Sequence, residues 1–209
     1  MSSYELVYQK LRENILNGHY KHGDELRETA VGKEIGVSRT PVIEALRQLE
    51  LEGLVTIIPN RGAFVNGISK QDVQDIYLIR ARLEGLCARM AAERIDESTL
   101  EEMEETMMLT AFHEEQGHYD QLFKLDSRFH SLLYEACKSK ILEHELKIFH
   151  QYVQQVRKNA LKKEARAEQS TKEHMAVMEA IKAHNADEAD RLATRHILNS
   201  IKNHHYTKI

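Results

Sequence analysis

The pattern of apolar and polar positions predicts three helices in the first quarter of the chain. Apolar side chains recur there every three or four residues, which is the spacing of a helix that buries one face. The pattern covers residues 4–17, 27–35 and 38–52. In the first of these helices we expect the inward-facing side chains to be Leu6, Val7, Leu11 and Ile15.

The third of these helices has clear start signals and a polar outer face. Gly36 suits the end of the preceding helix, Ser38 is a favourable N-cap, and Pro41 falls in the first turn. The apolar stripe consists of Val42, Ala45, Leu46 and Leu49. The side chains left facing outward are Arg39, Thr40, Ile43, Glu44 and Arg47. A helix-turn-helix whose second helix carries polar groups near its N-terminus fits a DNA major groove, so the pattern favours a DNA-binding protein over an enzyme.

A change of period after Gly53 predicts a small β-hairpin. The β-branched run at 54–58 and the apolar run at 63–65 flank the turn Pro59-Asn60-Arg61-Gly62. As a wing beside a helix-turn-helix, this hairpin would bring Arg61 to phosphate or the minor groove. A plain β-ribbon that closes the domain is the structural alternative.

Beyond a linker at 66–69, helical spacing continues almost without interruption. It predicts six helices, at about 69–94, 97–116, 119–137, 140–164, 168–184 and 186–205. Six helices of this length form an antiparallel bundle. The expected fold is therefore mainly α, with a winged helix-turn-helix domain at 1–66 and an all-helical domain at 67–209.

Composition and charge limit how the protein could bind DNA and where in the cell we expect it. The 209 residues carry a net charge of −4, and residues 1–68 hold eight Lys/Arg against nine Asp/Glu. DNA binding would therefore require the few arginines to gather on one face, and a dimer to double the phosphate contacts. The polar N-terminus and the lack of a long apolar stretch predict a cytoplasmic protein with no membrane contact. We expect Cys87 and Cys137 to be buried free thiols.

Four motifs in the first domain resemble the winged helix-turn-helix of the GntR family. They are Gly18-x-Tyr20-x-x-Gly23-x-x-Leu26, Ile35 through Val42, Glu52 through Val55, and Pro59 through Val65. The second domain is similar to the all-helical FCD domain of the FadR-type branch, and six helices suit its VanR-like subgroup. Its markers are Arg80-x-x-Leu83-Glu84, Asp126-x-x-x-His130, Glu173-His174 and His196. The resemblance implies a homodimeric bacterial transcription regulator whose affinity for DNA changes with a small metabolite, often an organic acid.

The resemblance also implies a DNA-contacting set with two departures. The expected set is Ser38, Arg39, Thr40, Ile43, Arg47, Arg61 and Gly62. Relatives usually have arginine at the position of Ile43, and some have it at the position of Thr29. An isoleucine can contact a thymine methyl group. We therefore expect an atypical operator sequence.

A metal site is implied for the second domain. Asp126 and His130 lie one helical turn apart, which by itself is typical of a surface pair. With the resemblance, Asp126, His130, His174 and His196 become the expected ligands of a divalent transition metal: zinc, nickel or manganese. The remaining histidines are expected to be solvated or core residues; they include His113, His118, His144, His150, His184, His204 and His205.

The resemblance also places Arg80 at the same site, where it would pair with a carboxylate effector. An internal salt bridge, for instance with Glu84, is the alternative role of this arginine.

Three functions are compatible with these residues. The first is a regulator that binds a palindromic double-stranded DNA operator and responds to a small organic acid. The second is a metal-dependent enzyme that uses the same Asp/His cluster, although no nucleophile or acid/base pair accompanies it. The third is a metal sensor without an organic effector.

Overall fold

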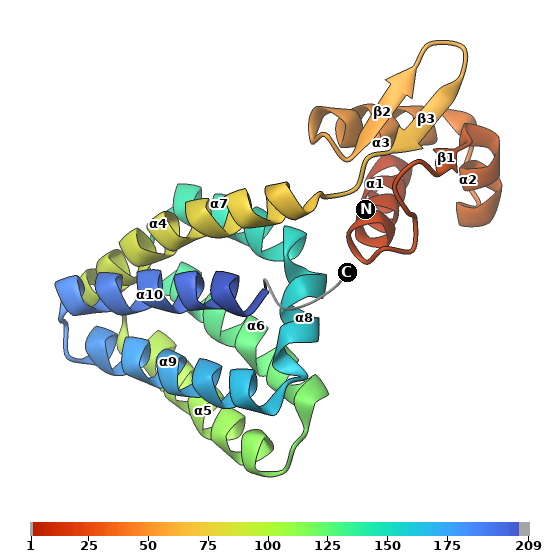
Figure 1. The fold of residues 1–209 in the computed structure, drawn as a ribbon. Coiled ribbons are helices and arrows are strands. Elements are labelled where there is room, and N and C mark those ends of the chain that lie inside the picture. Colours follow the sequence, from red (N-terminus) through yellow and green to blue (C-terminus); the bar gives the residue numbers. More distant parts are fainter. Residues whose placement is uncertain (1, 205–209) are drawn as a thin grey trace. The chain divides into compact units, whose positions relative to one another are not determined.

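The chain forms two compact units, Met1–Lys70 and Gln71–Ile209, in the computed structural model. The structure describes residues 2–204, without the side chains of residue 155 and residues 202–204. Each unit has its own arrangement of helices (Figure 1). The expected end of the last helix at residue 205 lies outside the described residues.

The first unit contains three helices and a three-stranded sheet. The helices are α1 (Ser3–Leu16), α2 (Glu28–Ile35) and α3 (Arg39–Leu51). The strands are β1 (Glu25–Leu26), β2 (Val55–Ile58) and β3 (Gly62–Val65). The helices and the hairpin of β2 and β3 occur where the apolar spacing predicts them.

The core of this unit forms where α1 packs on α3. On α1 the buried stripe consists of Val7, Leu11 and Ile15, which are spaced four residues apart. Leu6 lies beside this stripe and is 38% exposed, so the expectation that it faces inward was wrong.

The sheet contains one strand that the sequence pattern did not predict. Its order is β1-β3-β2 with antiparallel neighbours, and Leu26 of β1 pairs with Ala63 of β3. A strand of two residues is too short to show a period of two, which explains why it escaped detection.

Local backbone geometry confirms the predicted end of α2 and the predicted start of α3. Gly36 ends α2 in the left-handed conformation, with φ of 81°. Ser38 is the N-cap of α3 in extended conformation, although its side chain makes no capping hydrogen bond.

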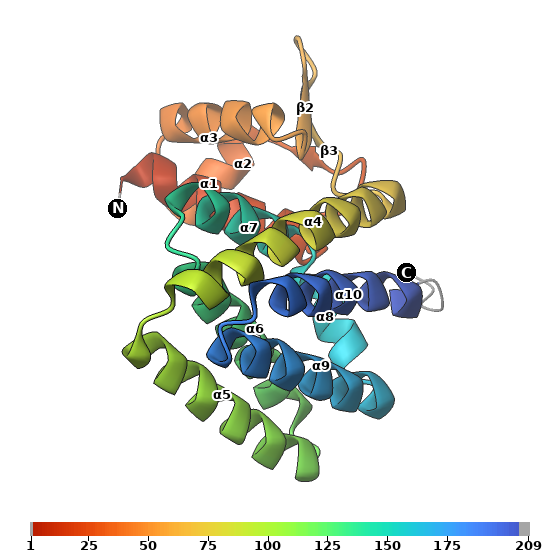
Figure 2. The same cartoon turned by 90° about the vertical axis from the view of Figure 1, so that its left-hand side faces the viewer.

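The second unit is an all-helical bundle (Figures 1 and 2). In the described residues its helices are α4 (Lys70–Arg94), α5 (Glu97–Glu115), α6 (Tyr119–Ala136), α7 (Lys140–Tyr152), α8 (Gln154–Leu161), α9 (Glu164–Lys182) and α10 (Ala186–His204). Neighbours in sequence pack closely, above all α5 with α6 and α9 with α10. Their buried apolar faces form one core cluster.

The described part of the bundle has seven helices, so the expectation of six was wrong. The segment predicted as one helix at 140–164 divides at Val153, which is fully buried and has φ of −99° and ψ of 10°. No glycine or proline marks the break. The helix therefore ends at a buried residue, at a point where local sequence gives no signal.

Helices α4 and α10 approach each other at Gly85. A Cβ atom on this glycine would overlap the side chains of Thr194 and Asp190, and would lie 3.2 Å from the backbone oxygen of Asp190. Any larger residue would require the side chains of Thr194 and Asp190 to move and the two backbones to separate slightly.

Two further expectations concern cysteines and membranes. Cys87 and Cys137 are buried free thiols, as predicted. Among the described residues, no helix is both long enough and apolar enough to span a membrane.

Candidate functional site

The predicted DNA-contacting residues lie on α3 and at the tip of the hairpin. Five of the seven line one hollow of about 540 Å³ between α3 and the hairpin; they are Arg39, Ile43, Arg47, Arg61 and Gly62. Ser38 and Thr40 are exposed at the start of α3, outside the lining. The structure thus brings most of the expected set onto one surface.

This surface is basic although the whole unit is not. The charged residues that line the hollow are the arginines 27, 39, 47 and 61 and the glutamates 25 and 28. Glu25 pairs with Arg27, and Glu28 pairs with Arg39. Arg47 and Arg61 make no ion pair with any described residue, so their charges are available to a ligand.

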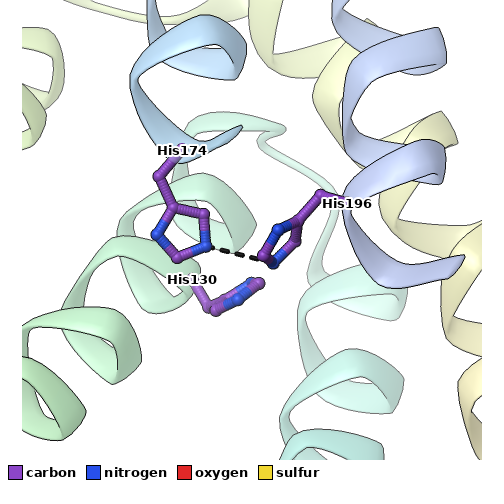
Figure 3. A group of neighbouring side chains, drawn as sticks. All are labelled: His130, His174 and His196. Carbon is purple, nitrogen blue, oxygen red and sulfur yellow. Dashed lines mark hydrogen bonds between the residues drawn. The ribbon is translucent and has the colours of Figure 1, made fainter. Parts of the chain in front are cut away.

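The second candidate site lies inside the helical bundle. Asp126 and His130 project from α6, His174 from α9 and His196 from α10. All four are buried, with 2–7% of each residue exposed. Figure 3 shows the three imidazole rings turned toward one another.

The three histidines form a group of metal-ligating geometry. One ligand atom from each lies within 4.8 Å of the others, and His174 Nε2 lies 3.1 Å from His196 Nε2. Two imidazole nitrogens that share one ion at about 2.0–2.1 Å, with bond angles of about 90–110°, lie about 2.9–3.4 Å apart. The observed separation therefore suits a shared transition metal ion.

Carboxylates lie behind two of the rings. His196 Nδ1 is hydrogen-bonded to Glu173 Oε2 at 2.7 Å, a contact that fixes the ring and leaves the opposite nitrogen for a metal. His130 Nδ1 lies 3.0 Å from Glu84 Oε2, within ion-pair distance but without the geometry of a hydrogen bond. Although burial raises the pKa of Glu173, the hydrogen bond to His196 and neighbouring charges lower it to about 2.

Electrostatics keep two of the rings neutral, which is the form that binds metals. Burial lowers the pKa of His174 well below its usual range, and the neighbouring His196 lowers it further. Burial is also the main cause of the lowered pKa of His196.

Asp126 stands beside the histidine group but not within it. Its Oδ1 lies 3.8 Å from His174 Nε2, while its Oδ2 accepts a hydrogen bond from Arg157. Burial alone would raise the pKa of Asp126, but the charges of Arg157 and nearby histidines hold it well below its usual range. The carboxylate is therefore ionised, with one oxygen directed at the cluster.

Arg80 is buried and forms an ion pair with Glu84. This is the alternative role that its position in the sequence suggested. Its Nε lies 2.9 Å from Glu84 Oε1, which also accepts a hydrogen bond of 2.9 Å from the Tyr134 hydroxyl. One nitrogen of the guanidinium, Nη1, has no hydrogen-bond partner in the described structure.

Residues 3–65 match the family described as "Bacterial regulatory proteins, gntR family", and residues 75–199 match the FCD domain. Among curated proteins, the chain is 30% identical to the HTH-type transcriptional regulator YdhC of Bacillus subtilis over 92% of this chain and 87% of that one. It is also 30% identical to the HTH-type transcriptional repressor RspR of Escherichia coli, over 91% and 84%. The chain belongs to the GntR family, in the branch with an FCD domain. It is a DNA-binding transcription regulator and not an enzyme.

Solved structures show the same fold. The GntR-family chain resembles Escherichia coli McbR/YncC with a TM-score of 0.77 at 20% identity, over 98% of each chain. It resembles a putative GntR regulator of Rhodococcus sp. RHA1 with a TM-score of 0.71 at 21% identity, over the whole of both chains.

The sequence of this GntR-family regulator did not predict two residues that border the histidine group of the FCD domain. His150 forms a second group with Glu84 and His130 that could hold a metal, and Arg157 binds Asp126. His150 and Arg157 come from α7 and α8, the helices that the sequence predicted as one, and neither lies at a spacing that relates it to the cluster. Glu84 could be linked to the site from the sequence, because it lies one helical turn after Arg80.

Proposed function

We propose that this GntR-family regulator binds a palindromic operator as a homodimer and represses transcription until a small organic acid binds its FCD domain. A divalent transition metal held by Asp126, His130, His174 and His196 assists that binding. The observation that carries the proposal is the group of three buried imidazoles.

The hollow beside α3 supports the DNA-binding half. Arg47 and Arg61 flank it with unpaired charges, which suits phosphate. Ile43 lines the same hollow and offers an apolar contact to a thymine methyl group. RspR, one of the relatives, is named as a repressor.

The chemistry of the donor set supports the metal-binding half. Nitrogen ligands with one carboxylate suit zinc, nickel or manganese. Such an ion supplies positive charge and open coordination positions to a carboxylate. Arg80, whose Nη1 is buried without a partner, adds a hydrogen-bond donor for the same ligand.

The metal assignment is tested by metal content. The purified full-length protein is stripped with a chelator, offered zinc, nickel or manganese in turn, dialysed, and analysed by mass spectrometry. We expect one ion per chain in the wild type and in the control His144→Ala, which alters an exposed residue of α7. We expect less than a tenth of that in His174→Ala with intact circular dichroism. One retained ion per chain in His174→Ala and in His196→Ala would refute the assignment.

The regulatory part is tested on DNA. A palindromic duplex selected from a random pool serves as the probe, and fluorescence anisotropy measures its affinity with and without metal and a panel of organic acids. An acid that shifts the affinity only in the metal-loaded protein supports the proposal. A shift by metal alone, to which no acid adds, favours a metal sensor instead.

A further inference from the structure

Four buried nitrogen atoms at or near the histidine group have no hydrogen-bond partner among the described residues. One is His130 Nδ1, which lies 3.0 Å from Glu84 Oε2, and the other three are Arg80 Nη1, Arg157 Nη1 and His150 Nε2. A buried donor that is left without a partner destabilises the folded protein, and more so when it is charged. Three such atoms around one cluster therefore indicate a ligand that accepts hydrogen bonds.

The last three atoms belong to residues that border the cluster from separate helices. His150, on α7, has its ring centroid 5.0 Å from that of His130, and its Nδ1 lies 3.5 Å from Arg80 Nη2. Arg157, on α8, reaches the cluster through Asp126.

The charges around the cluster already balance. Arg80 pairs with Glu84, Arg157 with Asp126, and Arg166 with Glu173. The histidine ligands of a metal are neutral. A divalent ion would therefore add two positive charges that no described group compensates, and a buried net charge is costly.

We propose that the FCD site binds a small dicarboxylate, with Arg157 and His150 forming a second anion subsite beside the metal and Arg80. This inference rests on the proposed metal site. One carboxylate neutralises charge at the metal and accepts from Arg80 Nη1. The other accepts from Arg157 Nη1, and from His150 Nε2 when the ring carries its proton there.

The free donors favour two separate anionic groups over one compact ion. The Nε and Nη2 atoms of Arg80 are occupied by Glu84, and the Nη2 of Arg157 is occupied by Asp126 and Ser127. The Nη2 of each arginine is thus taken by its own carboxylate, and Arg80 offers a single nitrogen. Phosphate, which guanidinium groups bind best with two parallel donors, fits this arrangement less well.

The test compares anions of equal size by isothermal titration calorimetry on the zinc-loaded full-length protein. The probes are malonate, succinate and glutarate, their monocarboxylate counterparts propionate, butyrate and valerate, and inorganic phosphate. We expect at least one dicarboxylate to bind roughly ten- to a hundredfold more tightly than its counterpart, which is the effect of one hydrogen-bonded charge.

Variants test whether His150 and Arg157 are responsible for the preference for dicarboxylates. His150→Phe and Arg157→Gln should each remove most of the dicarboxylate preference while one zinc ion per chain is retained. The matched controls are His144→Ala on the exposed face of α7 and Arg128→Gln, an exposed arginine of α6. Because His150 is not among the expected metal ligands, its variant remains informative if Arg157→Gln fails to fold.

The outcomes separate this inference from the proposed function. Zinc binding with equal affinity for succinate and butyrate, and likewise for the other pairs, overturns the inference alone. Tighter binding of phosphate than of any dicarboxylate also overturns it. Failure of the wild type to bind zinc, nickel or manganese overturns both.

Discussion

At the scale of single residues, the arginines of the α3 surface differ in whether they form an ion pair. Arg47 and Arg61 form no ion pair with any residue that the structure describes, whereas Arg39 pairs with Glu28, a residue of α2 that lines the same hollow. Glu28 therefore competes with a phosphate for Arg39.

Glu28→Gln should raise the affinity for operator DNA. Exposed ion pairs contribute about 0–1 kcal/mol, so we expect binding about two- to fivefold tighter, measured by fluorescence anisotropy. Glu34→Gln removes the same charge from α2 outside the hollow and serves as the control. An equal gain in both variants would show that net charge alone, and not release of Arg39, is responsible.

Ile43 is the residue of this surface where base preference should depart from that of relatives. Ile43→Arg should shift the selected operator toward guanine at the contacted position, because arginine pairs with the acceptors of guanine. Discrimination of about 1–3 kcal/mol is typical of such a contact. Selection from a random pool measures it, and identical sequence preferences for both proteins would contradict the role of Ile43.

At the scale of elements, the contact between α4 and α10 links two parts of the proposed metal site. Helix α4 carries Arg80 and Glu84, and α10 carries His196. Gly85 allows the two helices to approach, because any Cβ would overlap Thr194 and Asp190.

Gly85→Ala should destabilise the protein and weaken metal binding together. In an open helix this change would stabilise by about 1 kcal/mol, but overpacking here should cost about 1–3 kcal/mol. Chemical denaturation and zinc titration measure the two effects. Thr194→Ala removes one of the overlapping atoms, so Gly85→Ala/Thr194→Ala should recover part of the loss. A variant with increased stability would refute the steric role of Gly85.

Local spacing predicted the helices and the hairpin well because each depends on contacts within one element. Asp126 and His130 could be related in the same way, since they lie one turn apart on α6. The positions of His150 and Arg157 depend on where α7 ends, at the buried Val153, and no glycine or proline marks that point in the sequence. The strand β1 likewise exists only through its pairing with β3.

At the scale of the whole molecule, the proposed dimer needs an exposed apolar face. Leu78 and Leu86, eight residues apart on α4, are 54% and 42% exposed and share one side of the helix. Helix α4 also carries Arg80 of the proposed effector site and directly follows the DNA-binding domain in the chain. A dimer through this face would link effector binding to the spacing of two DNA-binding domains.

Leu78→Glu/Leu86→Glu should give a monomer with weak operator binding. Light scattering coupled to size exclusion measures the assembly. The control Leu109→Glu/Phe112→Glu alters two exposed apolar residues of α5 and should remain dimeric. A dimeric α4 variant, or a monomeric α5 variant, would place the interface elsewhere.

The pair of Glu28 and Arg39 also affects how DNA binding responds to ionic strength. An arginine that meets a phosphate normally releases one condensed counterion, which adds about 0.9 to the slope of log Kd against log salt concentration. When Arg39 moves from Glu28 to a phosphate, the abandoned carboxylate attracts a cation from solution. The net release from this contact is therefore smaller than for an arginine that has no carboxylate partner. Operator binding by this regulator should tolerate salt better than its number of arginines suggests.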